Sequence, residues 1–184
     1  MAKHAWTILC EKVLQDSESP LYTFVDVYDR LTINTSAELP DVEAKLDEVK
    51  KGGGRGIGVP ARIRLVTQWF RSDISQPEES KCRIRLVDPL GDILFEQKIS
   101  IELVESPLQR VAIRASAINI TVLGYYWWVV EKPKATQGKR EQWTEVTRLP
   151  LLIHAAPSPS PRVSRAPQRP GSSPRKDPRG GARR

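Results

Sequence analysis

Residues 61–70 read Ala-Arg-Ile-Arg-Leu-Val-Thr-Gln-Trp-Phe, and apolar and polar side chains alternate along them. The apolar positions are Ile63, Leu65 and Trp69. The polar positions between them are Arg62, Arg64 and Gln68. Because successive side chains of a β-strand point to opposite faces, this period of two predicts a strand with one buried and one polar face.

The same alternation recurs at 81–88. Its apolar positions are Cys82, Ile84 and Leu86, and its polar positions are Lys81, Arg83 and Arg85. The segment Asp88-Pro-Leu-Gly-Asp92 follows, in which proline presets φ and glycine accepts a positive φ. We therefore expect a strand that ends in a tight turn.

Further extended segments are predicted along the chain, at 5–14, 21–33, 93–103, 109–114, 125–132 and 143–154. Polar or glycine-containing breaks separate them, and no helix of 10–15 residues lies between successive strands. This pattern predicts an all-β fold, an antiparallel β-sandwich of immunoglobulin- or C2-like plan with about seven to eight strands.

One segment, at about 41–58, departs from the strand pattern. Val42, Leu46 and Val49 are apolar at helical spacing, Asp41 suits an N-cap, and Gly52 suits the end of a helix. We expect a short helix at 42–51, with its apolar stripe over an open end of the sandwich. The glycine-rich stretch 52–58 is predicted to be a flexible loop.

The charge divides the 184-residue chain into two parts. It holds 29 Lys and Arg against 22 Asp and Glu, but residues 1–156 carry 21 of each sign. Residues 157–184 are rich in proline and have one acid, so we expect a disordered basic tail after a β-sandwich domain at 1–156. The candidate polyanion-binding residues of this tail are Arg162, Arg165, Arg169, Arg175, Lys176, Arg179, Arg183 and Arg184.

Composition argues against several classes of protein. No apolar run approaches the ~20 residues of a membrane span, and the apolar residues 5–10 are too few for a signal peptide. Two cysteines form neither a disulfide framework nor a zinc ligand set. We expect free thiols and a cytoplasmic location.

No catalytic, metal or cofactor site is predicted. His4, Cys10, Cys82 and His154 lack the short ligand spacings of metal sites, although His4 and His154 would approach each other if the terminal strands paired. The glycines at 52–58 follow a helix rather than a strand, which is the wrong order for a nucleotide fingerprint. Asp88 and Asp92 offer too few oxygens for calcium and are interpreted as turn residues.

Arginines on the polar faces are the first candidate binding residues. If 61–70 and 81–88 pair as a hairpin, Arg62, Arg64, Arg83 and Arg85 share one surface together with Lys81. Like charges that face each other destabilise a sheet, so this surface needs acidic neighbours or an anionic partner. Both interpretations stay open, with Glu96, Glu102 and Glu145 as the candidate neighbours.

The second candidate is the aromatic run Tyr125-Tyr126-Trp127-Trp128. On a strand, Tyr125 and Trp127 point to one face and Tyr126 and Trp128 to the other. One pair belongs in the core. The other covers the outer face, packs under the helical insertion, or forms a patch for binding or self-association.

Several segments resemble a family of small uncharacterised bacterial β-sandwich proteins, a domain of unknown function. The resemblance rests on Ala5-x-x-Ile-Leu-Cys-Glu11, Phe24-Val-Asp-Val-Tyr-Asp-Arg30, Gly124-Tyr-Tyr-Trp-Trp-Val-Val130 and Leu149-Pro-Leu-Leu-Ile153. It covers about residues 5–155 and implies a β-sandwich of bacterial origin. It supplies no catalytic residue, and the insertion at 41–58 departs from a compact version.

The sequence thus favours a non-enzymatic interaction module that binds another protein or itself through edge strands or the 125–128 strand. The alternative is a nucleic-acid-associated protein that uses the arginine face and the basic tail. An enzyme is not favoured, because no convergent set of titratable groups is visible.

Overall fold

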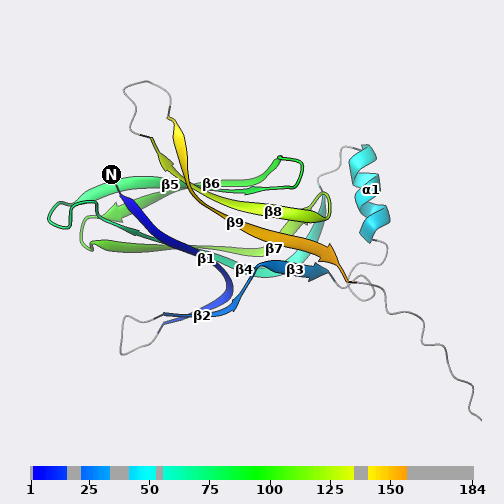
Figure 1. Ribbon diagram of the computed structural model, residues 1–184, viewed down its shortest axis with the longest axis horizontal. Helices are drawn as coiled ribbons and strands as arrows, with labels where there is room; N and C mark the ends of the chain where they lie inside the picture. The colour runs from blue at the N-terminus through cyan, green and yellow to red at the C-terminus, as the bar shows by residue number, and fades with distance from the viewer. Residues whose placement is uncertain (1, 16–21, 34–41, 53–55, 135–140, 157–184) are drawn as a thin grey trace, which may run out of the picture.

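The strands form two sheets that pack face to face (Figure 1), which confirms the predicted all-β sandwich. The computed structural model describes residues 2–15, 22–33, 42–52, 56–134 and 141–156, and the predicted tail lies outside these ranges. Sheet A has the order β2 (Tyr22–Val27), β1 (Lys3–Gln15), β4 (Ile57–Phe70) and β7 (Leu108–Ile120). Sheet B has the order β3 (Arg30–Ile33), β9 (Trp143–Ala155), β8 (Gly124–Pro133), β5 (Glu78–Val87) and β6 (Ile93–Leu103).

The core lies between the two sheets and consists of the inward-pointing residues of each strand. The predicted apolar faces of β4 and β5 are both buried, including Ile63, Leu65 and Ile84. Trp69 and Tyr126 are the largest side chains with no exposed surface. Burial of an aliphatic side chain such as Ile63, Leu65 or Ile84 contributes about 1.5–3 kcal/mol to stability. The alternation along the strands therefore also drives the packing of the two sheets against each other.

The condition that 61–70 and 81–88 pair as a hairpin is not fulfilled, because β4 and β5 belong to different sheets. Their apolar faces meet across the core, and their polar faces therefore point away from each other. Arg71 lies in the connection between β4 and β5 and binds the end of β6. Its Nε donates to the Leu103 carbonyl at 2.6 Å and its Nη2 to the Val104 carbonyl at 2.6 Å.

The segment predicted as one strand at 21–33 divides into β2 and β3, which lie in different sheets. The Tyr28 N–H donates to the Leu9 carbonyl of β1 at 2.8 Å, whereas the Leu152 N–H of β9 donates to the Asp29 carbonyl at 2.9 Å. The chain thus exchanges hydrogen-bond partners within two residues. β3 then runs parallel to β9, whereas the other strand pairs among the described residues are antiparallel.

The inserted helix α1 (Val42–Gly52) lies at one end of the sandwich (Figure 1), and Val42 and Leu46 are buried there as predicted. The loop predicted to reach residue 58 is shorter, because Ile57 and Gly58 already belong to β4. Gly56 has φ +83°, and a Cβ at this position would lie 2.7 Å from the Ile120 carbonyl oxygen. This glycine is therefore required by close backbone packing.

Candidate interaction surfaces

The aromatic strand β8 sends alternate side chains to opposite faces. Tyr126 and Trp128 point into the core, with exposed fractions of 0% and 2%. The Tyr126 hydroxyl accepts a hydrogen bond from the Thr121 N–H at 2.9 Å and donates one to the Val122 carbonyl at 2.7 Å. These two aromatic residues are therefore structural.

Tyr125 and Trp127 lie on the outer face of sheet B. Their rings stack with centroids 6.3 Å apart, and Tyr125 is 54% exposed. On β9, Leu152 is the register partner of Tyr125 and Pro150 that of Trp127. We call Tyr125, Trp127, Pro150 and Leu152 the aromatic patch.

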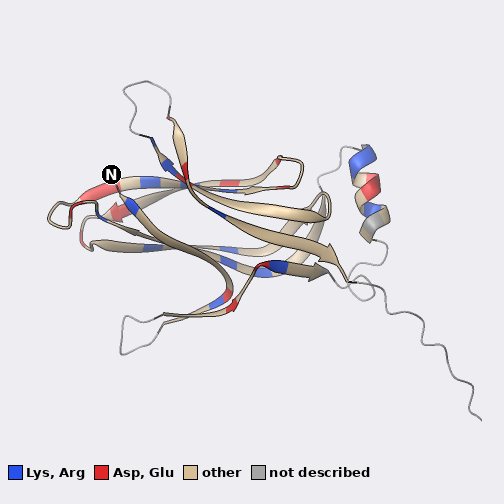
Figure 2. Cartoon of the chain, in the orientation of Figure 1, with Lys and Arg blue, Asp and Glu red and all other residues tan. Residues whose placement is uncertain are grey.

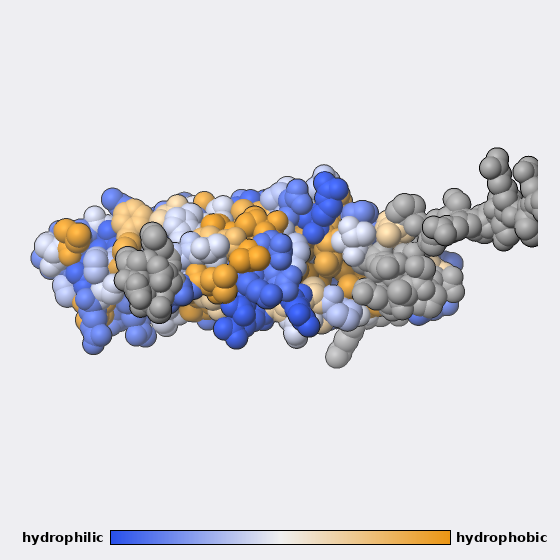
Figure 3. Space-filling view, turned by 90° about the horizontal axis from the view of Figure 1, so that it is seen from below, coloured by the Kyte–Doolittle hydropathy of each residue, from blue (hydrophilic) through white to orange (hydrophobic). Residues whose placement is uncertain are grey.

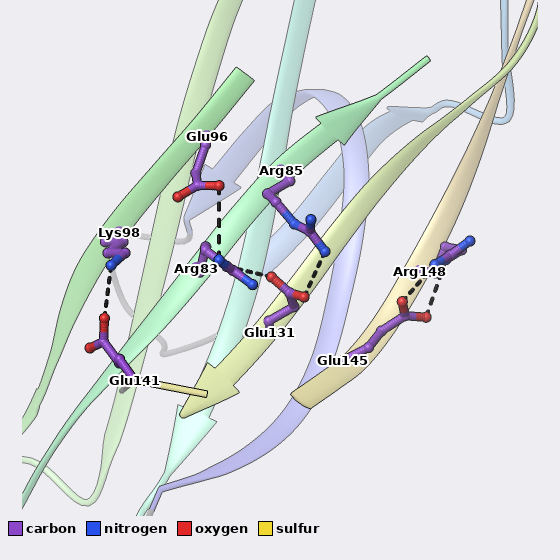
Figure 4. Close-up of polar contacts among 8 residues, drawn as sticks. All are labelled: Arg83, Arg85, Glu96, Lys98, Glu131, Glu141, Glu145 and Arg148. Atoms are coloured by element: carbon purple, nitrogen blue, oxygen red, sulfur yellow. Dashed lines mark hydrogen bonds and ion pairs between the residues drawn. The ribbon is translucent and has the colours of Figure 1, made fainter. Parts of the chain in front are cut away.

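Arg83 and Arg85 project from the same outer face, next to the buried carboxylate of Glu131 (Figure 4). Arg83 Nε donates to Glu131 Oε2 at 2.6 Å and Arg85 Nη2 to Glu131 Oε1 at 2.7 Å. Glu96 lies 3.9 Å from Arg83. Acidic neighbours thus neutralise these two arginines, so they are poor candidates for an anion site.

Sequence reasoning missed Glu131, the acid that contacts both Arg83 and Arg85. It faces outward on β8, as Tyr125, Trp127 and Val129 do, and its register partner on β5 is Arg83. The alternation of β8 could have placed it on the same face as Tyr125 and Trp127. Its partner could not be predicted, because the neighbour of β8 is decided by the sheet order.

Two further ion pairs complete the polar part of this face. Lys98 lies 2.8 Å from Glu141, and Arg148 lies 2.7 Å from Glu145 (Figure 4). The Arg148 guanidinium also sits 5.5 Å from the centroid of the Trp127 ring. The outer face of sheet B therefore combines balanced charges with an aromatic patch.

Arg62 and Arg64 lie on sheet A, so the surface that a hairpin would have given to all four arginines does not form. Basic and acidic residues are spread over both sheets (Figure 2). Arg64 is the direct register partner of Arg114 on β7, a residue that sequence reasoning did not select. Because like charges that face each other across a strand pair repel, this is an unfavourable pairing unless an anion joins it.

The remaining candidate groups have local roles. His4 hydrogen-bonds to Thr7 at 2.7 Å, whereas His154 hydrogen-bonds to Thr32 at 2.9 Å in the other sheet. β1 and β9 do not pair, so the condition under which these two imidazoles would meet is not fulfilled. In the described ranges no group of three or more His, Cys, Asp or Glu residues is arranged to hold a metal ion.

Asp88 is buried at the turn between β5 and β6. Its Oδ1 accepts hydrogen bonds from the N–H groups of Leu90 and Asp92, at 2.9 and 2.8 Å. Its Oδ2 accepts one from the Thr121 hydroxyl at 2.6 Å. The carboxylate therefore ties this turn to the one between β7 and β8.

Both cysteines are free and buried. Burial raises the pKa of the Cys82 thiol to about 12, and burial also raises the pKa of Cys10, against the opposing charge of Arg64. A nucleophilic cysteine needs the opposite shift, toward a lower pKa.

The protein is thus an all-β sandwich with charged residues on both outer faces and an aromatic patch on the outer face of sheet B. No protein-family model matches the chain, and no curated protein matches it. Among the described residues, no helix has the length and apolarity to cross a membrane.

Proposed function

We propose that this protein is a non-enzymatic β-sandwich interaction module, and that a second copy of the chain docks on its aromatic patch. The observation that carries the proposal is the stacked pair of Tyr125 and Trp127 on the outer face of sheet B. Tyrosine and tryptophan are enriched in the buried centres of protein interfaces, where they contribute much of the binding energy.

The surroundings of the patch favour a protein partner. Pro150 and Leu152 extend the apolar surface along β9. The charges nearby are paired, since Arg148 bonds to Glu145 and both Arg83 and Arg85 bond to Glu131. A face without net charge attracts apolar protein surface better than it attracts a polyanion.

Charge complementarity favours a second copy. Glu145 and Arg148 lie on β9, the strand that also carries Pro150 and Leu152, with side chains 41% and 48% exposed. In a two-fold symmetric contact the same patch serves both partners, so Arg148 of one copy can meet Glu145 of the other. The aromatic patches would form the centre of that contact.

The non-enzymatic part of this proposal is supported by the surroundings of the two cysteines and the two histidines. Both thiols are buried, and the imidazoles of His4 and His154 are engaged by threonine hydroxyls. The bacterial origin and the cytoplasmic location expected from the sequence stay predictions.

Sedimentation velocity of the full chain, over a range of about 1–100 µM, tests self-association. We expect a reversible dimer in the wild type and at least roughly tenfold weaker association in the Tyr125→Ser/Trp127→Ser variant. The control is Leu14→Ser, which removes a side chain of similar exposure, 55%, from sheet A. A wild type that stays monomeric at the highest concentration, or a double variant that associates as the wild type does, refutes the proposal.

A further inference from the structure

A cleft of about 420 Å³ opens on the outer side of sheet A, and basic side chains dominate its lining. Lys12, Arg62, Arg64 and Arg114 line it, with Glu11 as the acid among them. Figure 3 looks onto the side on which β2 lies, and strongly hydrophilic residues gather near its middle, next to hydrophobic ones. This cleft is separate from the aromatic patch, which lies on the other sheet.

The path of β1 explains why there is a cleft. The register between β1 and β4 ends where Cys10 faces Arg64, and beyond that point β1 pairs only with β2. Glu11 and Lys12 therefore diverge from β4 and form one wall. β4 and β7 form the opposite wall, with Arg62, Arg64 and Arg114.

A β-bulge places Arg62 in this wall. The register between β4 and β7 shifts between Pro60 and Ile63, where β4 contains one residue more than its partner strand. Bulges of this kind redirect side chains and are common beside functional sites. With its neighbours Arg64 and Arg114, Arg62 makes three guanidinium groups on adjoining positions of two strands.

No ion pair inside the described part of the chain neutralises the cations in the cleft. Within the part of the chain that the structure describes, none of Lys12, Arg62, Arg64 and Arg114 lies within 4.0 Å of a carboxylate. The arginines of sheet B differ, since Arg83 and Arg85 share the carboxylate of Glu131. Charged groups on this face of sheet A are therefore available to an external anion.

Glu11 does not cancel the positive charge. The Tyr28 hydroxyl donates a hydrogen bond to Glu11 Oε2 at 3.4 Å, and burial raises the pKa of Tyr28, which keeps this donor protonated. With one acid against four basic groups, the lining has a formal charge of +3 at neutral pH.

We propose that this cleft binds the phosphate backbone of single-stranded nucleic acid. Guanidinium groups bind phosphate oxygens with two parallel hydrogen bonds, and three of them lie together here. A cleft of about 420 Å³ admits a phosphate with an adjoining sugar, whereas a duplex could reach it only with its outer phosphates. The excess of seven positive charges in residues 157–184 adds a long-range attraction for a polyanion.

Fluorescence anisotropy with labelled oligo(dT) and oligo(U), titrated with the full chain at several salt concentrations, tests the site. We expect affinity to fall about five- to tenfold in Arg64→Gln and again in Arg114→Gln. Each variant should also lower the slope of log affinity against log salt by about 0.7, the value for one phosphate contact on a single strand. The control is Lys81→Gln, which removes one positive charge from an exposed position on β5 of sheet B and should leave both quantities unchanged.

Three outcomes would overturn the proposal. If Arg64→Gln and Arg114→Gln bind with the wild-type affinity and slope, binding belongs to residues 157–184 and not to the cleft. If both variants lose binding only as much as Lys81→Gln does, the effect is net charge. If the oligonucleotides do not bind, but pyrophosphate binds to the wild type and not to Arg64→Gln, the ligand is a small phosphate compound.

Sedimentation of the same variants separates this site from the dimer contact. Arg64 and Arg114 lie on sheet A and the aromatic patch lies on sheet B. We therefore expect Arg64→Gln and Arg114→Gln to associate as the wild type does. Loss of dimerisation in these variants would show that the two surfaces are not independent and would refute the assignment of the cleft.

Discussion

The substitution Glu131→Gln tests the centre of the charged network on sheet B. The Glu131 carboxylate is 7% exposed and accepts hydrogen bonds from two guanidinium groups at 2.6 and 2.7 Å. Glutamine has nearly the same shape, so the substitution removes the negative charge without opening a cavity. We expect a folded protein with lower stability.

The expected loss follows from the geometry. A glutamine oxygen can still accept from one arginine, but the amide NH₂ then faces the other guanidinium, donor against donor. A hydrogen bond to a charged group contributes about 1.5–3 kcal/mol, and breaking a fully buried ion pair costs about 3–5 kcal/mol. Arg83 and Arg85 keep 19% and 22% of their side-chain surface in water, which weakens the interaction. We therefore expect the free energy of unfolding to fall by about 2–3 kcal/mol, close to the range for a hydrogen bond to a charged group.

Urea unfolding followed by tryptophan fluorescence measures this loss. The midpoint should fall while the m-value stays constant, because the surface exposed on unfolding is unchanged. Glu145→Gln is the matched control, since Glu145 also contacts an arginine at 2.7 Å but both side chains are 41–48% exposed. We expect less than about 0.5 kcal/mol for the control.

Two results would refute the reasoning about Glu131. One is a Glu131→Gln variant whose free energy of unfolding lies within about 0.5 kcal/mol of the wild type, which is the range of an exposed pair. The other is a Glu145→Gln variant that loses as much as Glu131→Gln does, since burial would then play no part.

Three further perturbations have defined outcomes. Gly56→Ala should lower the free energy of unfolding in urea by at least about 2 kcal/mol, because its Cβ would meet the Ile120 carbonyl oxygen at 2.7 Å. The control Gly91→Ala, at φ +95° with open space around it, should cost only about 1 kcal/mol. Equal costs would contradict the role of close packing. Tyr126→Phe should lose about 1–3 kcal/mol by the same assay, because it leaves buried backbone groups without a partner, and an unchanged midpoint would show that its hydrogen bonds contribute nothing. Burial lowers the pKa of His4 below its usual 6.5, so the unfolded chain binds more protons than the folded one at acid pH, and wild-type stability should fall as the pH drops through and below 6.5. In thermal unfolding at about pH 5 and about pH 7.5, His4→Gln should show a smaller difference between the two pH values than the wild type, and an equal difference would assign the acid loss to other groups.

The sequence predicted what depends on neighbouring residues in the chain. The alternation at 61–70 and 81–88 identified two strands and their buried faces, and the apolar spacing at 42–49 identified the helix. The partner of each strand could not be predicted in this way, because pairing depends on contacts between segments far apart in the chain. This is why the alternation could leave the pairing of the two arginine-bearing strands only as a condition, and the sheet order does not fulfil it.

The same distinction applies to the candidate surfaces. Alternation along 125–128 separated the two aromatic pairs correctly, but it could not decide which pair is buried. That depends on which face of β8 meets sheet A. Arg114 was missed for a related reason: it is the last residue of the strand predicted at 109–114, and its importance arises only from Arg64 in the neighbouring strand.

The parallel pair of β3 and β9 has a consequence for folding during synthesis. It joins residues 30–33 to residues 152–155, so sheet B reaches its full width only after almost the entire domain has left the ribosome. Until β9 arrives, one edge of β8 has no neighbour, and its tyrosines and tryptophans border an open strand. Sequence-distant contacts of this kind slow folding and prolong the lifetime of unpaired edges. The nascent chain therefore passes through a stage in which the aromatic strand β8 has an open edge, and β9, the last of the described strands, is the one that covers it.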